Sequence, residues 1–169
     1  RAAPLGTGTF KVGGNYAASL RGTIKSQQAG YGAPMYLDCC EKKYIDEIGA
    51  ANFFAIKDNT YITPKSSSIL ASITNMSLIT LAEDLGYKVE RRPVSVDELE
   101  SFEEVGACGT AAVISPIGEV IDIESGKVYK FCKDCKAGPV SKKLYDTLVG
   151  IQYGDIEDKH GWVTIIDKD

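Results

Sequence analysis

The sequence predicts an α+β fold in one domain of 169 residues. Three observations lead to this prediction. Short β-like runs cluster between residues 34 and 64, other segments carry apolar residues at helical spacing, and strands mix with helices without a regular βαβ alternation. A chain of this length fits a single core, and no long linker or internal repeat divides it. We therefore expect a mixed sheet with flanking helices rather than a doubly wound parallel sheet.

The first half of the chain predicts one helix followed by several strands. Tyr16, Leu20 and Ile24 recur at helical spacing before a glycine, which indicates a helix near residues 15–29. An Asp-Asn turn separates the last two of the strands that follow, so we expect them to pair antiparallel. These strands are MYLD, YIDE, NFFAI and TYITP.

The second half predicts two further long helices and more strands. Ser72 is a candidate N-cap for the clearest helix, SITNMSLITLAEDLG, and Ser95 and Glu98 occupy capping-box positions at the start of a short helix. Apolar spacing predicts the last helix over 139–153. The expected strands are YKVERRPV, AAVISPI, EVIDI, VYKF and the tail GWVTII.

Composition excludes several classes of function. The net charge is -4, and Lys and Arg form no cluster beyond short pairs, so nothing indicates nucleic-acid binding. No apolar run approaches the roughly 18 residues of a membrane span. The five cysteines are odd in number, and the first residues do not resemble a signal peptide. We expect a cytoplasmic protein whose partners are small molecules or other protein chains.

Lys11 is the first candidate functional residue, because it stands directly before two glycines in KVGGNY. A lysine in such a place is most often a solvated turn residue. The functional alternative is an amine that condenses with a carbonyl, as lysines do in Schiff-base and pyridoxal phosphate chemistry. Lys11 by itself does not decide between the two.

Other segments offer the remaining parts of a pyridoxal phosphate site. Glu47 at a strand end could face a pyridine nitrogen, and SITN places Thr74 among free N–H groups at a helix start, where anions bind. A second small-residue loop, ACGTAA, contains Thr110. Each of these three features also has a structural interpretation. Glu47 is then a solvated acid, the SITN segment is an ordinary helix cap, and ACGTAA is a turn.

The order of these motifs makes the resemblance specific. The chain resembles fold-type IV pyridoxal phosphate enzymes from about residue 4 to 162, and most closely the branched-chain amino acid aminotransferases. The motifs are KVGGNY, EIGAANFF, SSSILASITN, ACGTAAVISPI and GIQYGDIEDKHGW. The closing EDKHGW is more similar to these than to D-amino acid transaminases or aminodeoxychorismate lyases, which remain alternatives. The resemblance implies that residues 1–169 form one pyridoxal phosphate-binding large C-terminal domain of the D-amino acid aminotransferase-like fold, with a barrel-like sheet, and that the small N-terminal domain is absent.

The resemblance also implies roles for individual residues. Lys11 would carry pyridoxal 5′-phosphate as a Schiff base and then move the proton between the substrate α-carbon and the cofactor. Tyr16 would contact the ring oxygen and the substrate, and Glu47 would pair with the protonated pyridine nitrogen.

The phosphate and the substrate carboxylate would lie at two loops. Ile73 and Thr74 would bind the phosphate through backbone N–H groups, Thr110 would complete that cradle, and the Ala111 N–H would lie near the substrate carboxylate. The family motif more often reads Leu-Pro-Gly-Ile-Thr-Arg where this chain has residues 70–75, LASITN. The two N–H donors survive this change.

The implied activity is transfer of the amino group of L-leucine, L-isoleucine or L-valine to 2-oxoglutarate, by a homodimer in the full-length enzyme. The alternative from a different class is a catalytically inert fragment that binds cofactor or dimerises. We expect these 169 residues alone to have no appreciable transaminase activity, because the absent domain and the partner subunit would supply most of the wall around the substrate side chain.

The remaining cysteines and the single histidine give weak signals. Cys132 and Cys135 form one Cys-x-x-Cys, and a zinc site needs four ligands, so incidental thiols are the favoured interpretation and no metal is predicted. The same applies to the vicinal pair Cys39-Cys40. His160, in a charged segment, is interpreted as a surface or packing residue.

Overall fold

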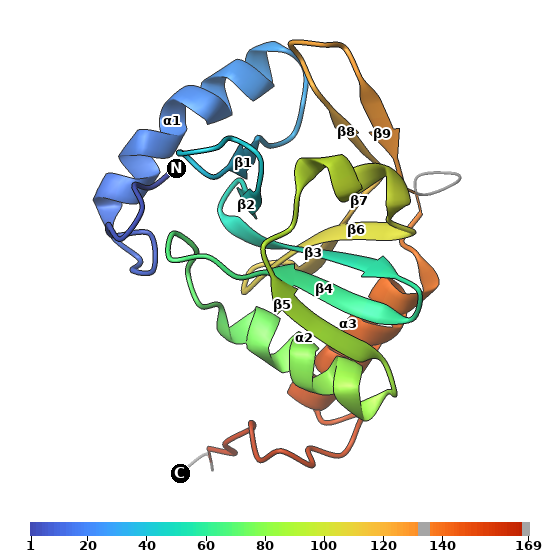
Figure 1. The fold of residues 1–169 in the computed structure, drawn as a ribbon. Coiled ribbons are helices and arrows are strands. Elements are labelled where there is room, and N and C mark those ends of the chain that lie inside the picture. Colours follow the sequence, from blue (N-terminus) through green and yellow to red (C-terminus); the bar gives the residue numbers. More distant parts are fainter. Residues whose placement is uncertain (132–135, 167–169) are drawn as a thin grey trace.

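The computed structural model describes residues 1–131 and 136–166. Its strands and helices mix as an α+β fold, so the predicted class is confirmed (Figure 1). In chain order the elements are α1 (Gly13–Gln28), β1 (Met35–Leu37), β2 (Ile45–Ile48), β3 (Ala51–Lys57), β4 (Thr60–Pro64), α2 (Ile73–Asp84), β5 (Lys88–Arg92), the 3₁₀ helix η1 (Val96–Ser101), β6 (Glu104–Gly109), β7 (Val113–Ile117), β8 (Glu119–Ile121), β9 (Val128–Lys130) and α3 (Pro139–Tyr153).

Strand β3 is the centre of a seven-stranded sheet. β6 pairs antiparallel with β3 along Asn52–Ile56 and continues into β7. The other edge of β3 pairs with β2 at its start and with β4 at its end. β1 extends the sheet beyond β2, and β5 extends it beyond β4 in the one parallel pairing among the described strands. Because β2 and β4 share one edge of β3, they diverge around residues 53–54.

Two apolar clusters cover the two faces of this sheet. One face packs against α2 and α3, where Leu78, Leu144 and Leu148 meet Phe54 and Tyr61 of the sheet (Figure 1). The other face packs against η1 and the β8–β9 hairpin, and its buried members include Phe53, Leu99 and Phe102. Burial of this apolar surface is the main favourable term in folding.

Polar contacts position the starts of the two covering helices. Ser72 caps α2 by accepting a hydrogen bond from the Asn75 N–H, as its position in the sequence predicted. The N-cap of α3 is Gly138, which has no side chain, and the Glu104 carboxylate of β6 accepts the Val140 and Ser141 N–H groups instead, at 2.9 and 2.8 Å. A Cβ at Gly138 would lie 2.0 Å from the Glu104 carboxyl carbon, so only glycine leaves room for this carboxylate.

Helix α1 lies to one side of the sheet (Figure 1) and is joined to it by few contacts. The Tyr36 hydroxyl of β1 donates to the Ser19 carbonyl at 2.9 Å, and the Tyr36 ring lies against Gly22. The buried residues of α1 are Asn15 and Ser26, whereas Leu20 and Ile24 are exposed. Polar groups therefore attach this helix to the rest of the chain.

Several expectations about secondary structure were wrong. The segment ACGTAA is not one loop, because Ala107–Gly109 belong to β6, and only residues 110–112 form the turn to β7. The tail GWVTII forms no strand. Ile73, an apolar residue in the first turn of α2, is 73% exposed. The sheet is open within the described residues, since no pairing joins β1 or β5 to β7, so the barrel-like closure is not found.

Candidate active site

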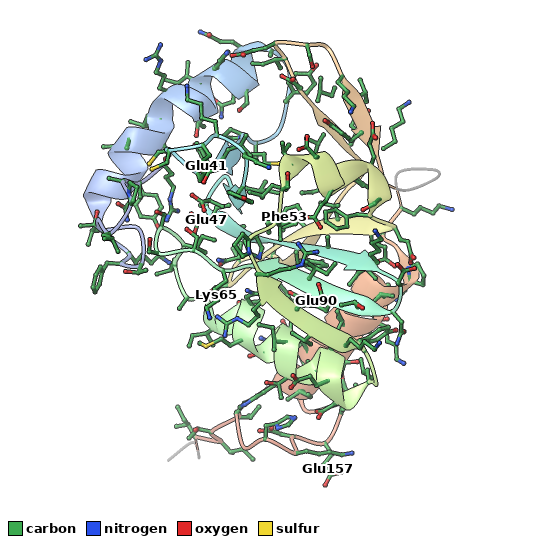
Figure 2. All side chains as sticks on the ribbon, in the orientation of Figure 1. Glu41, Glu47, Phe53, Lys65, Glu90 and Glu157 are labelled. Atoms are coloured by element: carbon green, nitrogen blue, oxygen red, sulfur yellow. The ribbon has the colours of Figure 1, made fainter. Side chains whose placement is uncertain are left out.

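Glu47 is a buried carboxylate near the end of β2, where β2 and β4 diverge. Its Oε1 accepts the Leu70 N–H at 3.2 Å, and Oε2 forms an ion pair with the Arg1 guanidinium. Burial is the largest influence and raises the pKa of Glu47, whereas Arg1 and the Leu70 N–H lower it. Figure 2 shows Glu47 on the side of the sheet that faces the N-terminal segment and α1. The interpretation of Glu47 as a solvated strand-end acid is therefore wrong.

The β4–α2 loop brings the start of α2 beside this carboxylate. Leu70 donates its N–H to Glu47, and its carbonyl accepts the Asn52 side-chain amide at 2.9 Å. Within the described residues, the N–H groups of Ile73 and Thr74 donate no hydrogen bond. Two free donors at a helix N-terminus form an anion-binding position.

The turn between β6 and β7 meets the same end of the sheet. Cys108 of β6 lies opposite Asn52 of β3, and Asn52 lies opposite Glu47 of β2. A Cβ at Gly109 would lie 3.8 Å from the Cβ of Ala51, so the turn runs close to the start of β3. Thr110 and Ala111 follow in an exposed turn, and their N–H groups have no acceptor among residues 1–131 and 136–166.

The N-terminal segment packs across the β4–α2 loop. A Cβ at Gly8 would lie 2.3 Å from the Ser68 carbonyl oxygen, so the two backbones touch at a position that requires glycine. Asn15 is buried, accepts the Thr7 hydroxyl at 2.8 Å, and donates to the carbonyls of Thr7 and Phe10 at 2.7 and 2.8 Å. The asparagine of KVGGNY therefore holds the turn that leads to Lys11.

The structure brings five of the predicted residues, Glu47, Ile73, Thr74, Thr110 and Ala111, to one end of the sheet and leaves two others exposed beside it. Strand register and the contacts of Leu70 join Glu47 to the start of α2 and to the β6–β7 turn. Lys11 and Tyr16 lie on the segment that packs there, and both are exposed. No hydrogen bond or ion pair within the described chain links Lys11 or Tyr16 to the other site residues.

Sequence reasoning missed Arg1, although its guanidinium is buried against Glu47. No spacing rule connects an arginine at position 1 with a glutamate at position 47, so the sequence contains no local signal for this pair. It also missed the role of Asn75, at the position where the family motif more often has arginine. Asn75 accepts the Tyr61 hydroxyl at 2.8 Å and donates to the Thr63 hydroxyl at 3.0 Å, which ties the start of α2 to β4.

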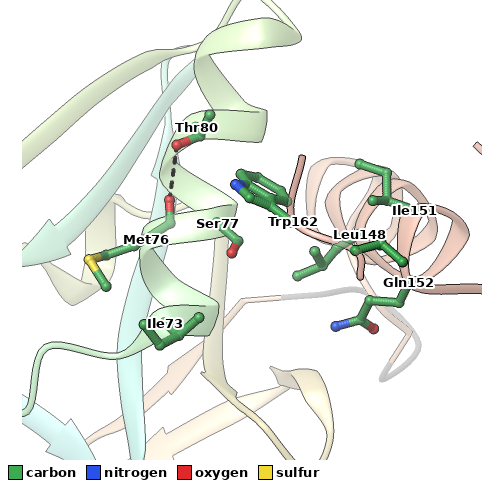
Figure 3. Close-up of a pocket in the computed structure, with 9 residues that line it drawn as sticks. Ile73, Met76, Ser77, Thr80, Leu148, Ile151, Gln152 and Trp162 are labelled. Carbon is green, nitrogen blue, oxygen red and sulfur yellow. Dashed lines mark hydrogen bonds between the residues drawn. The ribbon is translucent and has the colours of Figure 1, made fainter. Parts of the chain in front are cut away.

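A pocket of about 460 Å³ lies between α2, α3 and the C-terminal tail, and it shares Ile73 with the site described above (Figure 3). Its lining contains no charged side chain, so it offers no acid or base for catalysis. The lining residues are Ile73, Met76, Ser77, Thr80, Leu148, Ile151, Gln152, Trp162 and Val163.

His160 has a structural role at this tail. Its Nε2 lies 2.7 Å from the Asp84 carboxylate at the end of α2, and its ring stacks on Trp162 with 4.6 Å between the ring centroids. This agrees with its interpretation as a surface or packing residue.

The described residues contain no group of three or more side chains able to hold a metal ion. Cys132 and Cys135 lie outside the described residues. Cys39 and Cys40 are exposed, whereas burial raises the pKa of Cys108 to about 12. The Cys108 thiol is therefore protonated at neutral pH and is a poor nucleophile. In the part of the chain with assigned structure, no helix has the length and apolar character needed to cross a membrane.

The family model for amino-transferase class IV matches residues 7–120, which is more than half of the chain. The chain belongs to the class IV aminotransferases. The resemblance seen in the order of the motifs is thereby confirmed at the level of the family. The match includes the Lys11 segment, Glu47, the start of α2 and the β6–β7 turn.

Individual class IV aminotransferases align over nearly the whole chain. The branched-chain-amino-acid aminotransferase of Haemophilus influenzae is 48% identical over 99% of this chain and 50% of the relative. The structure of the branched-chain amino acid aminotransferase from Escherichia coli superposes with a TM-score of 0.83, at 35% identity, over 96% of this chain and 52% of that one. The branched-chain aminotransferase from Thermoproteus uzoniensis with norvaline gives a TM-score of 0.79 at 28% identity, over 93% and 49%. The chain thus spans about half the length of the relatives it matches.

Proposed function

We propose that this chain is the pyridoxal 5′-phosphate-binding domain of a branched-chain amino acid transaminase. The whole protein would transfer the amino group of L-leucine, L-isoleucine or L-valine to 2-oxoglutarate. The observation that carries the proposal is the meeting of a buried carboxylate, Glu47, with free N–H donors at Ile73, Thr74, Thr110 and Ala111 on one end of the sheet. The names of the aligned relatives support the substrate class.

The residues at this end of the sheet fit the cofactor. The unpaired N–H groups at the start of α2 suit a phosphate, since a helix N-terminus favours negative charge. The buried Glu47 suits a protonated ring nitrogen. A carboxylate has about four lone-pair positions, so Glu47 can accept a further donor while it retains Arg1 and the Leu70 N–H.

The bound cofactor supplies an electron sink for the carbanion that forms when the substrate α-carbon loses its proton. Glu47 keeps the ring nitrogen protonated through its negative charge, which opposes loss of that proton. Ile73 and Thr74 hold the phosphate and so fix the position of the ring. Lys11 would hold the cofactor through its amine and, once the substrate amine has displaced it, would move the proton at the substrate α-carbon, and Tyr16 would donate a hydrogen bond to the ring oxygen.

Two further residues orient these groups. Asn15 holds the turn before Lys11, and Asn75 holds the start of α2 against β4. Thr110 completes the phosphate cradle, and the Ala111 N–H receives the substrate carboxylate. Residues 1–169 would form a single large domain, the remaining wall of the substrate pocket would come from the rest of the protein, and the whole enzyme would be a cytoplasmic homodimer.

Borohydride trapping tests the proposal directly. The protein is incubated with pyridoxal 5′-phosphate, reduced, digested and mapped by mass spectrometry. We expect the label on Lys11, and we expect Lys11→Ala to lose it while Lys25→Ala, which removes an exposed lysine of α1, retains it. A label confined to other lysines would refute the role of Lys11.

A second measurement tests the substrate class. In the full-length protein we expect turnover of L-leucine, L-isoleucine and L-valine with 2-oxoglutarate, because an apolar pocket discriminates by only about 1 to 3 kcal/mol per methylene. Faster turnover of D-alanine than of L-leucine would assign the protein to the D-amino acid transaminases instead.

A further inference from the structure

Asp46 is a second buried carboxylate, directly before Glu47, in a strand whose pairing is irregular. β1 pairs Tyr36 with Glu47 and Leu37 with Ile45, so Asp46 has no opposite residue on β1. Such a bulge re-aims side chains and relaxes the strict alternation between the two faces of a sheet. Asp46 and Glu47 are therefore not forced onto opposite faces, as neighbours in a regular strand would be.

The surroundings of Asp46 leave it incompletely satisfied. The residue is 4% exposed, and within the described chain its Oδ1 has no hydrogen-bond partner. Burial is the largest influence and raises the pKa of Asp46, and the Ser66 hydroxyl of the β4–α2 loop is the main group that lowers it. The other charged side chains that act on it are the guanidinium of Arg1, which lowers its pKa, and Asp38, which raises it.

The cluster holds more negative than positive side-chain charge. The positive charge is the Arg1 guanidinium, which pairs with Glu47. The negative charge of Asp46 lies close enough to raise the pKa of Glu47. A buried charge without a full partner is costly, so a cation that enters beside Glu47 gains from both carboxylates. Asp46 differs in this respect from Glu104, a carboxylate whose two oxygens both accept backbone N–H groups.

We propose that Asp46 is a positioning residue for Glu47: its buried carboxylate supplies a second negative charge that lets Glu47 hold a cationic ring nitrogen while Glu47 remains paired with Arg1. This inference rests on the proposed function for the identity of the cation. Its electrostatic part, the coupling between the two carboxylates, is a property of the cofactor-free protein.

Side-chain carboxyl ¹³C NMR of the cofactor-free protein tests that coupling. We expect Asp46 and Glu47 to titrate together, with each signal responding to both steps. In Asp46→Asn the pKa of Glu47 should fall, because a neighbouring like charge is removed. Asp46→Glu keeps the charge and should restore most of the wild-type value.

The matched control is Glu104→Gln, which removes another buried carboxylate. Glu104 lies opposite Ile56 of β3, whereas Glu47 lies opposite Asn52, so the two positions are separated by about 13 Å along the strand. We expect this variant to leave the titration of Glu47 unchanged. An unchanged pKa of Glu47 in a folded Asp46→Asn protein would overturn the inference. If that variant does not fold, the wild-type titration decides, since two independent single-step curves also overturn it.

Equilibrium binding of pyridoxal 5′-phosphate, followed by absorbance, tests the link to the cation. We expect Asp46→Asn to bind about threefold to tenfold more weakly at neutral pH, equivalent to about half to one pKa unit, and Asp46→Glu to bind nearly as well as wild type. ¹⁵N NMR of labelled cofactor should show a less protonated ring nitrogen in Asp46→Asn. Equal affinity and an unchanged ¹⁵N shift would overturn this part.

The two proposals fail in different ways. If wild-type protein captures no cofactor on Lys11, the proposed function fails, whereas the ¹³C titration of the cofactor-free protein still measures the coupling. If Lys11 is labelled but Asp46→Asn changes neither titration nor affinity, the function stands and the role of Asp46 is refuted.

Discussion

Helices α1 and α3 have similar apolar spacing but opposite burial. Leu148 of α3 is 3% exposed and packs against the sheet, whereas Leu20 of α1 is 57% exposed. α3 covers a sheet face with its apolar side, and α1 is attached through the Asn15 side chain and the Ser19 carbonyl on its polar side. The comparison shows that periodicity predicts a helix and its apolar side, but not what lies against that side.

The largest expected effect comes from truncating the same residue type in both helices. Leu148→Ala should lower the free energy of unfolding by about 2 to 5 kcal/mol, because it leaves a cavity in the core. Leu20→Ala should change it by no more than about 0.5 kcal/mol. Urea unfolding followed by circular dichroism measures both. An equal loss in the two variants would mean that α1 is covered in solution and would break the comparison.

The start of α3 provides the next contrast, because a carboxylate caps it and no side chain caps α1. Glu104→Gln turns one acceptor into a donor that faces a backbone N–H. We expect a loss of about 1.5 to 3 kcal/mol in the free energy of unfolding, the usual range for a hydrogen bond to a charged group. Glu119→Gln, at an exposed position of β8, is the control and should be neutral. A neutral Glu104→Gln would show that the cap contributes nothing.

Asn15 should matter locally rather than globally, since α1 makes few contacts with the core. Asn15→Ala removes three hydrogen bonds to the turn before Lys11, each worth about 0.5 to 1.5 kcal/mol. We expect faster amide hydrogen exchange at residues 7–12 with little change at β3. Gln28→Ala on the exposed end of α1 is the control. Slower or unchanged exchange at residues 7–12 would contradict this role.

The smallest effect should appear at acid pH in the loop after β1. The Asp38 carboxylate accepts the N–H groups of Cys40, Glu41, Lys43 and Tyr44, and its pKa is lowered from 3.8 to about 2, chiefly by the Tyr44 and Glu41 bonds. Because the folded pKa is the lower one, this stabilisation is present above about pH 4 and is lost as the pH falls toward 2.

Thermal unfolding between about pH 5 and pH 2 checks the Asp38 prediction. The difference in melting temperature between wild type and Asp38→Asn should be largest near the upper end of this range and should shrink as the pH falls. A difference independent of pH would show that the contribution of Asp38 does not depend on its charge.

The sequence predicted most elements because their signals are local. Ser72 and the Ser95–Glu98 capping box stand within one turn of the N–H groups that they satisfy, and both caps are present in the structure. The antiparallel hairpin between β3 and β4 follows from a turn of two residues. The motifs also predicted which residues to consider at the site, and Glu47 and the start of α2 do lie together.

The failures involve partners far away in the sequence. The sequence of β6 consists largely of small residues and did not predict a strand, yet β6 pairs with β3 on one side and with β7 on the other. The Phe54 ring packs over Gly106, where an added Cβ would lie 2.4 Å from the nearest ring atom. The tail GWVTII has strand-like residues, but it adds to no strand of the sheet. The exposure of Ile73 follows from its position at the first turn of α2 rather than from its polarity.

By itself, the sequence determined the helices, their caps and most of the hairpins, because hydrogen bonds and backbone preferences act within a few residues. Only the tertiary structure decided that Arg1 pairs with Glu47, that Asp46 is buried without a full set of partners, that Glu104 caps α3, and that α1 turns its apolar side outward. These features depend on segments tens of residues apart that meet when the sheet forms. Burial and electrostatic pairing are set by such meetings, and no local pattern encodes them.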